Sequence, residues 1–242
     1  MKPLTDKIAV ITGGNSGIGY AAAKQLRESG ATVIITGRRK EAVEKAALEL
    51  DVTGVVADQS NLADIKNLVN TVAQQYGHID ILLVNAGITR FGTIEQMDEN
   101  TFDEVMNVNF KGAYFTLGKF IPILRNGASV IMLSSTSATI SPQSASVYAA
   151  SKAALNAVTK IAALELAPRQ IRVNAVSPGP IATEIMHKIG LDDKLEAQLV
   201  NSIPLSRMGK AAEVAGMISF LASEEAAFIT GSNFLVDGGQ SI

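Results

Sequence analysis

Three residues with acid, base and hydrogen-bonding side chains lie close together in the segment SSTSATISPQSASVYAASK. Tyr148 and Lys152 are separated by one helical turn, so on a helix they lie on one face. An ammonium beside a phenol favours the phenolate and lowers the pKa of the tyrosine, by about 1–3 units for a close opposite charge. Ser135, thirteen residues upstream, would follow the preceding strand, where its hydroxyl could hydrogen-bond the substrate oxygen that exchanges a proton with Tyr148. The pattern predicts Tyr148 as an acid or base, although a surface Tyr-Lys pair beside a polar loop has the same sequence.

A strand and a helix must hold these residues, and the sequence predicts both. The apolar residues 128–133 indicate a buried strand before Ser135, and the alanine-rich residues 147–166 indicate a helix that carries Tyr148 and Lys152. Similar apolar runs alternate with helical patterns along the chain, without a linker or a repeat. We therefore expect the α/β class: a single domain over residues 1–242, with a doubly wound parallel sheet of about seven strands and helices on both faces.

A glycine-rich turn lies between the first expected strand, residues 7–12, and the first expected helix, residues 20–28. Its glycines, Gly13, Gly17 and Gly19, have the spacing G-x-x-x-G-x-G. Glycines let the backbone approach a phosphate, and the free amides and dipole at a helix start favour its negative charge. This arrangement favours a dinucleotide diphosphate, although a tight turn with nothing bound would have the same sequence.

Cations follow the second expected strand, residues 31–36, where a dinucleotide site meets the adenosine ribose. An acidic residue there would bind the ribose hydroxyls and select NAD, but the chain has Gly37, Arg38, Arg39 and Lys40. Guanidinium groups attract a 2′-phosphate, so the sequence favours NADP(H) as the cofactor. The alternative is that these cations only solvate the start of the next helix.

Other polar or small residues follow expected strands at the edge where ligands bind to such sheets. Asp58 follows the third strand, where it could accept a hydrogen bond from adenine or cap a helix together with Asn61. The sequence Asn85-Ala86-Gly87 follows the fourth strand, and the segment 178–183 follows a strand at 172–176. In the long helical segment 100–124, Asn109 is a poor mid-helix residue and predicts a kink or a polar site.

Composition excludes several other kinds of function. The 242 residues carry 21 basic and 23 acidic side chains without a block of like charge, which gives no sign of a nucleic-acid or membrane partner. There is no cysteine and there are only two histidines, so we expect no metal site. No apolar run reaches the ~20 residues that span a bilayer, and the start of the chain enters a strand, so we expect a soluble, cytoplasmic protein.

Taken together, the motifs resemble those of the short-chain dehydrogenase/reductase family over nearly the whole chain. They are TGGNSGIG at 12–19, NAG at 85–87, Asn109, Ser135, YAASK at 148–152, PGPIAT at 178–183 and ITGSNFLVDGG at 229–239, in the family's order. The resemblance implies hydride transfer between a nicotinamide and an alcohol or carbonyl. It implies that Tyr148 donates or accepts the proton, Ser135 positions the carbonyl oxygen, and Asn109 supports a water-linked proton relay. Lys152 would lower the pKa of the tyrosine and hold the nicotinamide ribose.

The resemblance also implies the cofactor-binding residues. The diphosphate would be lined by residues of the glycine turn, adenine would meet Asp58, and the nicotinamide side would meet the segment after residue 177. Apart from Tyr148 and Lys152, the expected set is Gly13, Asn15, Ser16, Gly17, Ile18, Gly19, Arg38, Arg39, Asp58, Asn85, Ala86, Gly87, Pro178, Gly179, Ile181 and Thr183.

The expected function is NADPH-dependent reduction of a ketone or other carbonyl to an alcohol, with a small-molecule substrate. A 3-oxoacyl-[acyl-carrier-protein] reductase and a sugar dehydrogenase have the same motifs and remain alternatives. A non-enzymatic NADPH-sensing protein of the same fold would not need the Tyr-Lys pair. The charged helical segment 184–202 is a candidate substrate lid, and substrate choice would depend on it and on residues 136–147.

The helix with the catalytic pair also suggests self-association. Small and apolar residues run almost all round it, as in a helix that is buried on several sides. Phe110, Tyr114, Phe115, Leu117 and Phe120 of the segment 100–124 could pack beside it across a two-fold axis. The apolar end of the chain, residues 234–242, could be covered too. The family resemblance points to a homotetramer, whereas packing within one subunit is the alternative.

Overall fold

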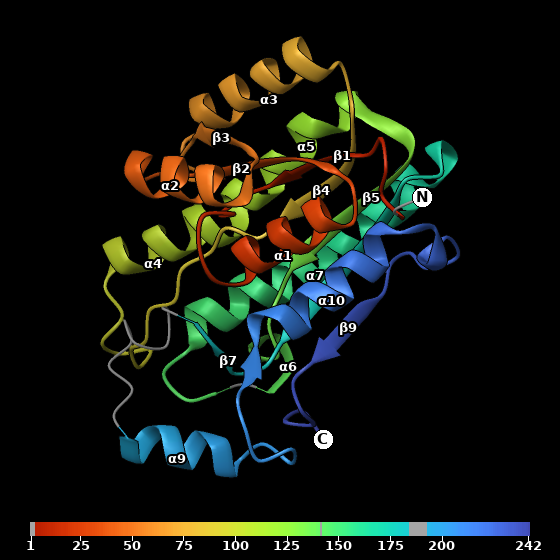
Figure 1. Cartoon of the computed structure of the whole chain (residues 1–242). Helices are drawn as coiled ribbons and strands as arrows, with labels where there is room; N and C mark the ends of the chain where they lie inside the picture. Colours follow the sequence, from red (N-terminus) through yellow and green to blue (C-terminus); the bar gives the residue numbers. More distant parts are fainter. Residues whose placement is uncertain (1–2, 141, 184–192) are drawn as a thin grey trace.

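The computed structural model describes residues 3–140, 142–183 and 193–242. Seven parallel strands form one sheet in the order β3-β2-β1-β4-β5-β6-β9 (Figure 1). They are β1 (Ile8–Ile11), β2 (Thr32–Gly37), β3 (Thr53–Val56), β4 (Ile79–Val84), β5 (Leu124–Leu133), β6 (Arg172–Pro178) and β9 (Asn233–Val236). Two short strands, β7 (Ile181–Ala182) and β8 (Gly209–Lys210), pair separately. The predicted fold class is therefore confirmed.

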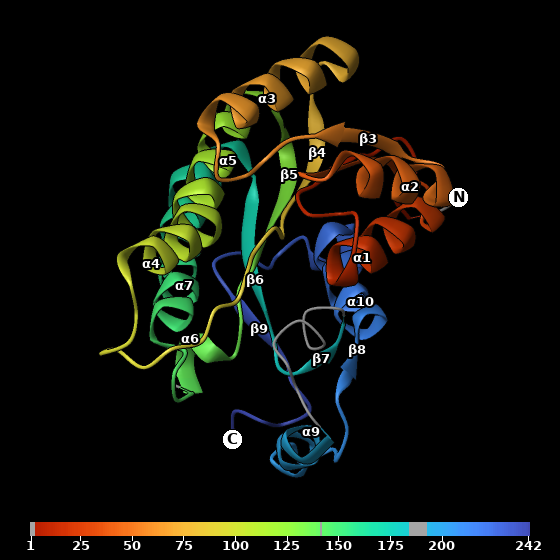
Figure 2. The same cartoon turned by 90° about the vertical axis from the view of Figure 1, so that its left-hand side faces the viewer.

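Helices cover both faces of the sheet, as Figure 2 shows edge-on. On one face lie α1 (Gly17–Glu28), α2 (Lys40–Leu50) and α10 (Ala211–Ala222). On the other lie α3 (Leu62–Tyr76), α4 (Glu99–Met106), α5 (Ala113–Phe120) and α7 (Ser146–Leu166). The short α6 (Ser137–Ile140) precedes α7, and α9 (Asp193–Asn201) lies at the end of the molecule where the chain returns towards β8.

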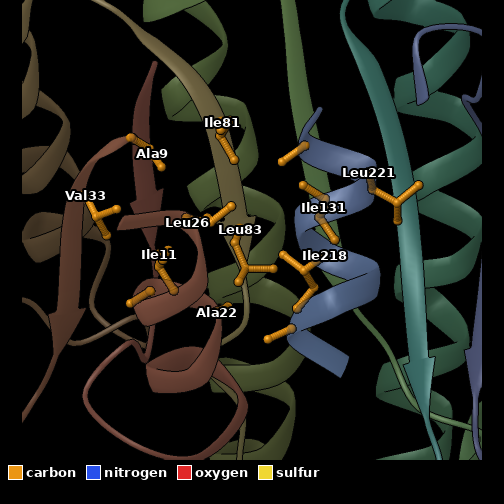
Figure 3. Packing of buried hydrophobic residues seen from close by; sticks show 14 of the residues in the cluster. Ala9, Ile11, Ala22, Leu26, Val33, Ile81, Leu83, Ile131, Ile218 and Leu221 are labelled. Atoms are coloured by element: carbon orange, nitrogen blue, oxygen red, sulfur yellow. The ribbon is translucent and has the colours of Figure 1, made fainter. Parts of the chain in front are cut away.

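Alternation along the central strands divides the core into two layers. In β1, Ala9 and Ile11 face α1 and α10, whereas Val10 faces the helices of the other layer. Figure 3 shows the first layer, in which Leu26 of α1 and Ile218 of α10 pack against β1 and β4. Because successive side chains of a strand point to opposite faces, a strand covered on both sides must be apolar throughout.

The predicted long helix at 100–124 is interrupted, and this corrects its expected course. After α4, residues Asn107–Gly112 form a π-helical turn, and α5 then ends before a short 3₁₀ turn at Ile121–Ile123. Leu124 already belongs to β5, so this strand begins before the predicted residue 128. Asn109 lies within this π-helical turn, at the position where a kink or a polar site was predicted. A π-turn closes each hydrogen bond over one residue more than an α-helix does, so the regular α-helix is interrupted there.

The fold places a ligand site where strand order reverses. From β1 the chain moves outwards to β2 and β3, and it then returns to β4 on the other side of β1. Loops that follow neighbouring strands diverge at such a point and leave a crevice at the carboxyl ends of the strands. The loops after β1, β4 and β5 carry most of the predicted site.

Candidate active site

Helix α7 and the end of β5 bring the predicted catalytic residues together. The Lys152 Nζ atom lies 5.8 Å from the centre of the Tyr148 ring, as expected for residues one helical turn apart. Nζ donates a hydrogen bond of 2.7 Å to the carbonyl of Leu133, the last residue of β5. Ser134 Oγ donates to the Lys152 carbonyl at 3.1 Å. These two bonds join the strand end to the catalytic helix.

Burial controls the proton affinities of this pair. It lowers the pKa of Lys152 to about 8. It raises the pKa of Tyr148, and the hydrogen bonds of the phenol with Ser135 and Thr89 only oppose that rise. The sequence argument expected Lys152 to lower the pKa of the tyrosine, but desolvation of the phenolate raises it, and the opposing contributions come from Ser135 and Thr89; this corrects the expectation. Tyr148 is therefore protonated at neutral pH and placed to donate a proton, while Lys152 is mostly an ammonium.

Asn109 lies fully buried in the π-helical turn and uses its amide in three hydrogen bonds. Its Oδ1 accepts from the Ile88 amide at 2.8 Å, and its Nδ2 donates to the Ile88 carbonyl at 2.9 Å. Nδ2 also donates to Ser151 Oγ at 3.2 Å, and Ser151 donates to the Tyr148 carbonyl. Asn109 therefore connects the loop after β4 to the catalytic helix.

The glycine turn after β1 packs directly on the loop after β4. Asn85 Nδ2 donates to the carbonyls of Thr12 and Gly13 at 2.8 and 3.0 Å. Gly13 has a φ of +64°, and a Cβ there would lie 2.9 Å from the Cα of Ala86. Thr12 Oγ1 accepts from the amides of both Asn85 and Ala86. The close approach of the two loops therefore requires a glycine at position 13.

The start of α1 is suited to an anion. Ser16 is the N-cap, but its side chain makes no capping hydrogen bond, and the first turn has no acidic residue. Its backbone amides thus remain available to a diphosphate, and the helix dipole favours one. Thr183, in the segment after β6, lies next to the start of α1. Its Cγ2 is 3.6 Å from the position that a Cβ on Gly17 would take. Ile18 and Gly19 continue the same turn into α1.

At the end of β2, the predicted 2′-phosphate residues Arg38 and Arg39 are exposed, whereas Gly37 is buried. A Cβ on Gly37 would lie only 2.3 Å from Asn15 Oδ1. The Asn15 side chain thus occupies the space beside Gly37 in which a longer side chain would have to fit.

Asp58 forms a tight turn after β3. Its Oδ1 accepts from the amide and the hydroxyl of Ser60, both at 2.8 Å. The cap of α3 is Asn61 alone, whose Oδ1 accepts from the Ala63 amide at 2.9 Å. Asn61, and not Asp58, therefore caps α3 with its side chain. The contact of Asp58 with adenine stays a prediction.

The segment after β6 is held by the end of the chain and by β8. Pro178 ends β6, and the Gly179 amide donates to the Val236 carbonyl at 3.1 Å. Ile181 is buried and lies against Gly209. Of the predicted lid at 184–202, residues 184–192 lie outside the described part of the chain, and α9 covers most of the remainder.

Sequence reasoning missed four polar residues that hold this site. Thr12, Gln59, Thr89 and Ser151 each contact a predicted site residue or the loop that carries one. Thr12 and Gln59 follow strands β1 and β3 and are almost fully buried. For Thr12 the signal in the sequence was a polar residue directly after the apolar strand β1. Gln59 lies three residues beyond β3, and its partners are distant along the chain, so no local pattern indicated it.

Comparison with known proteins agrees with this geometry. A family model described as enoyl-(acyl carrier protein) reductase matches residues 13–241. The 3-oxoacyl-[acyl-carrier-protein] reductase of Thermotoga maritima is 40% identical over 244 residues, which cover 98% of this chain and 98% of that protein. A short-chain dehydrogenase/reductase structure from Serratia marcescens has a TM-score of 0.94 at 33% identity, over 99% of this chain and 100% of that chain. A blue fluorescent protein from a metagenomic library, in complex with NADPH, has a TM-score of 0.93 at 29% identity, over 99% and 100% of the two chains.

The doubly wound sheet, the site at its switch point and these matches define an oxidoreductase of the dinucleotide-binding class. The chain belongs to the short-chain dehydrogenase/reductase family. Among the residues that the structure describes, no helix is both long enough and apolar enough to cross a membrane.

Proposed function

We propose that this protein is an NADPH-dependent reductase that converts a ketone or other small carbonyl compound to an alcohol. The observation that carries the proposal is the meeting of Tyr148, Lys152 and Ser135 at the end of β5, next to a glycine turn whose helix start lacks a side-chain cap. The first group supplies acid catalysis and the second supplies a diphosphate site. Together they favour an enzyme over a protein that only senses NADPH.

The residues present fit a dinucleotide along the carboxyl edge of the sheet. Gly13 and residues 15–19 would hold the diphosphate, Asp58 the adenine, and Arg38 with Arg39 the 2′-phosphate. Residues 85–87 would lie along the cofactor, and Pro178, Gly179, Ile181 and Thr183 would flank its nicotinamide side. When bound, NADPH supplies the hydride.

The protein's own part in the reaction is to orient the carbonyl and to supply a proton. Ser135 and the Tyr148 hydroxyl would both hydrogen-bond the carbonyl oxygen, which polarises it as negative charge develops. Tyr148 then gives its proton to that oxygen, and the Lys152 ammonium stabilises the resulting phenolate. Asn109 fixes the loop and the helix between which a water-linked relay would return the proton.

The NADPH preference is supported by charge. Two exposed guanidinium groups follow Gly37 at the end of β2, and no carboxylate stands between Thr36 and Glu41 to bind free ribose hydroxyls. The relative in complex with NADPH has the same fold over almost the whole chain. Both observations support NADP(H) as the cofactor.

Reduction of a 3-oxoacyl group carried on an acyl-carrier protein is the second candidate. It is favoured by the 40% identity to the Thermotoga maritima reductase. A sugar dehydrogenase stays the other alternative, because a structure from Brucella melitensis named as a glucose/ribitol dehydrogenase is 30% identical to this chain, with a TM-score of 0.95 over 100% of both chains.

A substrate panel with NADPH tests the proposal. Absorbance at 340 nm follows cofactor oxidation with an acetoacetyl thioester, small aliphatic ketones, aryl ketones and aldoses. We expect turnover with at least one ketone or thioester, and lower efficiency with NADH. Tight NADPH binding without turnover of any carbonyl, in either direction of the reaction, would instead support the sensing protein.

We also propose that a second copy of the chain covers the outer face of α5 and α7, in a homotetramer. Tyr114 is 49% exposed on α5, and Ile161 and Leu164 are 55% and 78% exposed on α7. Leu117 and Phe120 pack inside the subunit, so only part of the predicted aromatic set is available for such a contact. Phe228 and Ile242 form further exposed apolar positions near the end of the chain.

A further inference from the structure

Gln59 is a buried polar residue to which no catalytic or cofactor role has been given above. It follows Asp58 in the turn between β3 and α3, and its side chain is 7% exposed. A buried amide is costly unless it is hydrogen-bonded, because it loses its contacts with water. Its partners therefore indicate what it does.

Both N–H groups of the Gln59 amide are used on main-chain carbonyls of two separate segments. Nε2 donates to the carbonyl of Ala86 at 2.9 Å and to the carbonyl of Val108 at 2.9 Å. Oε1 is buried without a hydrogen-bond partner in the described part of the chain. Only this orientation of the amide places donors against the two carbonyls, since the reverse would place Oε1 against them.

The backbone of Gln59 is equally close to the π-helical turn. A Cβ on Gly112, the last residue of that turn, would lie 2.1 Å from the Gln59 carbonyl oxygen. Gly112 has an ordinary helical φ of −61°, so the glycine is needed for this approach and not for its backbone conformation. Side chain and main chain of Gln59 thus both hold the turn.

The two segments that Gln59 joins carry predicted site residues. Ala86 lies in the loop after β4, and Val108 directly precedes Asn109. Asn109 bonds back to Ile88 of the same loop. The contacts form a closed ring from Gln59 through the loop 86–88 to Asn109 and back through Val108. Without Gln59, side-chain hydrogen bonds between the loop and this turn would come from Asn109 alone, within the part of the chain that the structure describes.

We propose that Gln59 is a positioning residue that sets the spacing between the loop after β4 and the π-helical turn, and thereby the placement of Asn109 and of residues 85–87. The role of that placement in catalysis rests on the proposed reductase function. The spacing itself is a property of the protein alone. Gln59 also follows Asp58 directly, so the turn expected to meet adenine and the turn that carries Asn109 are anchored by adjacent residues.

Two substitutions remove the contact in different ways. Gln59→Met keeps the size of the side chain and removes both donors, which leaves two buried carbonyls without their partner. Gly112→Ala keeps Gln59 and forces its backbone away from the turn. Two matched controls are available. Thr116→Val removes a buried hydroxyl that has no partner in the described structure, and Gly216→Ala, on α10, adds a Cβ that meets nothing within 4 Å.

Amide hydrogen exchange tests the positioning role without any turnover. We expect exchange at the Ile88 amide and across residues 105–112 to quicken by at least about tenfold in Gln59→Met and Gly112→Ala, as for loss of a buried hydrogen bond. Exchange in α1 and α2, on the other face of the sheet, should match that of the controls. Unchanged exchange in both variants, or an equal rise throughout the protein, would overturn the proposal.

Kinetics then separate positioning from a general loss of stability. With the wild-type ketone substrate, we expect kcat to fall at least about tenfold in both variants at a temperature where both are folded, and to stay within twofold in both controls. If kcat equals that of the controls while only the melting temperature falls, Gln59 is structural and the proposal is wrong. If the wild type turns over no carbonyl, the proposed function fails, and the exchange comparison alone decides on Gln59. If Gln59→Met does not fold, Gly112→Ala and Gln59→Glu, which replaces the donor by an acceptor, take its place.

Discussion

Lys152 is a buried cation, and among the described residues its Nζ donates a hydrogen bond to one acceptor, the backbone carbonyl of Leu133. Burial lowers its pKa to about 8, whereas the pKa of Tyr148 is raised. The lysine therefore loses its proton before the tyrosine does as pH increases. If the ammonium is what stabilises the tyrosinate formed during reduction, the active protonation state is lost as pH rises through about 8.

We expect kcat for ketone reduction to be level between pH 6 and 7 and to decline above about pH 8. Lys152→Arg should remove this decline, because a guanidinium stays protonated up to a much higher pH, although its different shape will lower the overall rate. The pH dependence of kcat at saturating NADPH measures this. A rate that stays level to pH 10 in the wild type would contradict the assignment of the ammonium.

Cofactor selectivity is also decided by single residues. Charge-assisted hydrogen bonds contribute ~1.5–3 kcal/mol, so Arg38→Ala should raise the KM for NADPH by roughly 10–150-fold and leave the KM for NADH almost unchanged. Steady-state kinetics with the two cofactors provide the measurement, and Lys45→Ala on the outer side of α2 is a control. An equal change for both cofactors would show that Arg38 does not read the 2′-phosphate.

Gly37→Asp is the obvious further change towards NADH, but the structure predicts that it fails alone. Its Cβ would lie 2.3 Å from Asn15 Oδ1, so the new side chain would displace the glycine turn. We expect Gly37→Asp alone to weaken the binding of both NADPH and NADH. The double variant Asn15→Ser with Gly37→Asp should recover the binding of NADH. If Gly37→Asp alone bound NADH as tightly as the double variant does, the Asn15 side chain would be shown to move aside without weakening cofactor binding.

The starts of α1 and α3 differ in how they are capped. We therefore expect the start of α3 to contribute to the stability of the protein and the start of α1 to contribute to cofactor binding. Asn61 caps α3 with its side chain, whereas Ser16 at α1 makes no such bond. Asn61→Ala should lower the free energy of unfolding by about 1 kcal/mol. Ser16→Ala should change the free energy of unfolding little but weaken the binding of NADPH. Urea denaturation without cofactor and a fluorescence titration with NADPH provide the two measurements, and an equal loss of stability in both variants would contradict this division.

Elements that depend on local patterns could be predicted from the sequence, and those that depend on distant contacts could not. The buried strands are continuous apolar runs, and the glycine turn has a local spacing, so both were predicted correctly. The break of the 100–124 helix was indicated by Asn109, but its extent depends on Gly112 meeting Gln59, which is distant in sequence. The direction of the Tyr148 pKa shift depends on burial by the assembled fold, which a Tyr-Lys spacing does not contain.

At the scale of the whole molecule, exposed apolar side chains on α5 and α7 predict assembly. Leu164 and Ile161 of α7 are 78% and 55% exposed, and Tyr114 and Phe115 of α5 contact each other edge to face. Leu164→Glu together with Ile161→Glu should break a two-fold contact, because charges would have to be buried there. Lys66→Glu, a change of charge at an exposed position of α3, away from this face, provides a control.

Light scattering at micromolar concentration checks this expectation. The wild type should have a mass near four times the 25.4 kDa of one chain, and the double variant a smaller mass with unchanged helical content. A wild-type species at 25.4 kDa would show that these faces are exposed in solution and that the assembly proposal is wrong.

We propose that Tyr148 donates the proton at a site that reduces a carbonyl with NADPH. Tyr148→Phe removes the hydroxyl and keeps the ring, so it isolates the contribution of that proton. We expect kcat to fall by about 10²–10⁴-fold, the usual contribution of general acid catalysis, while the Kd for NADPH, measured by fluorescence, changes less than threefold. A loss of kcat below tenfold with unchanged NADPH binding would contradict the account.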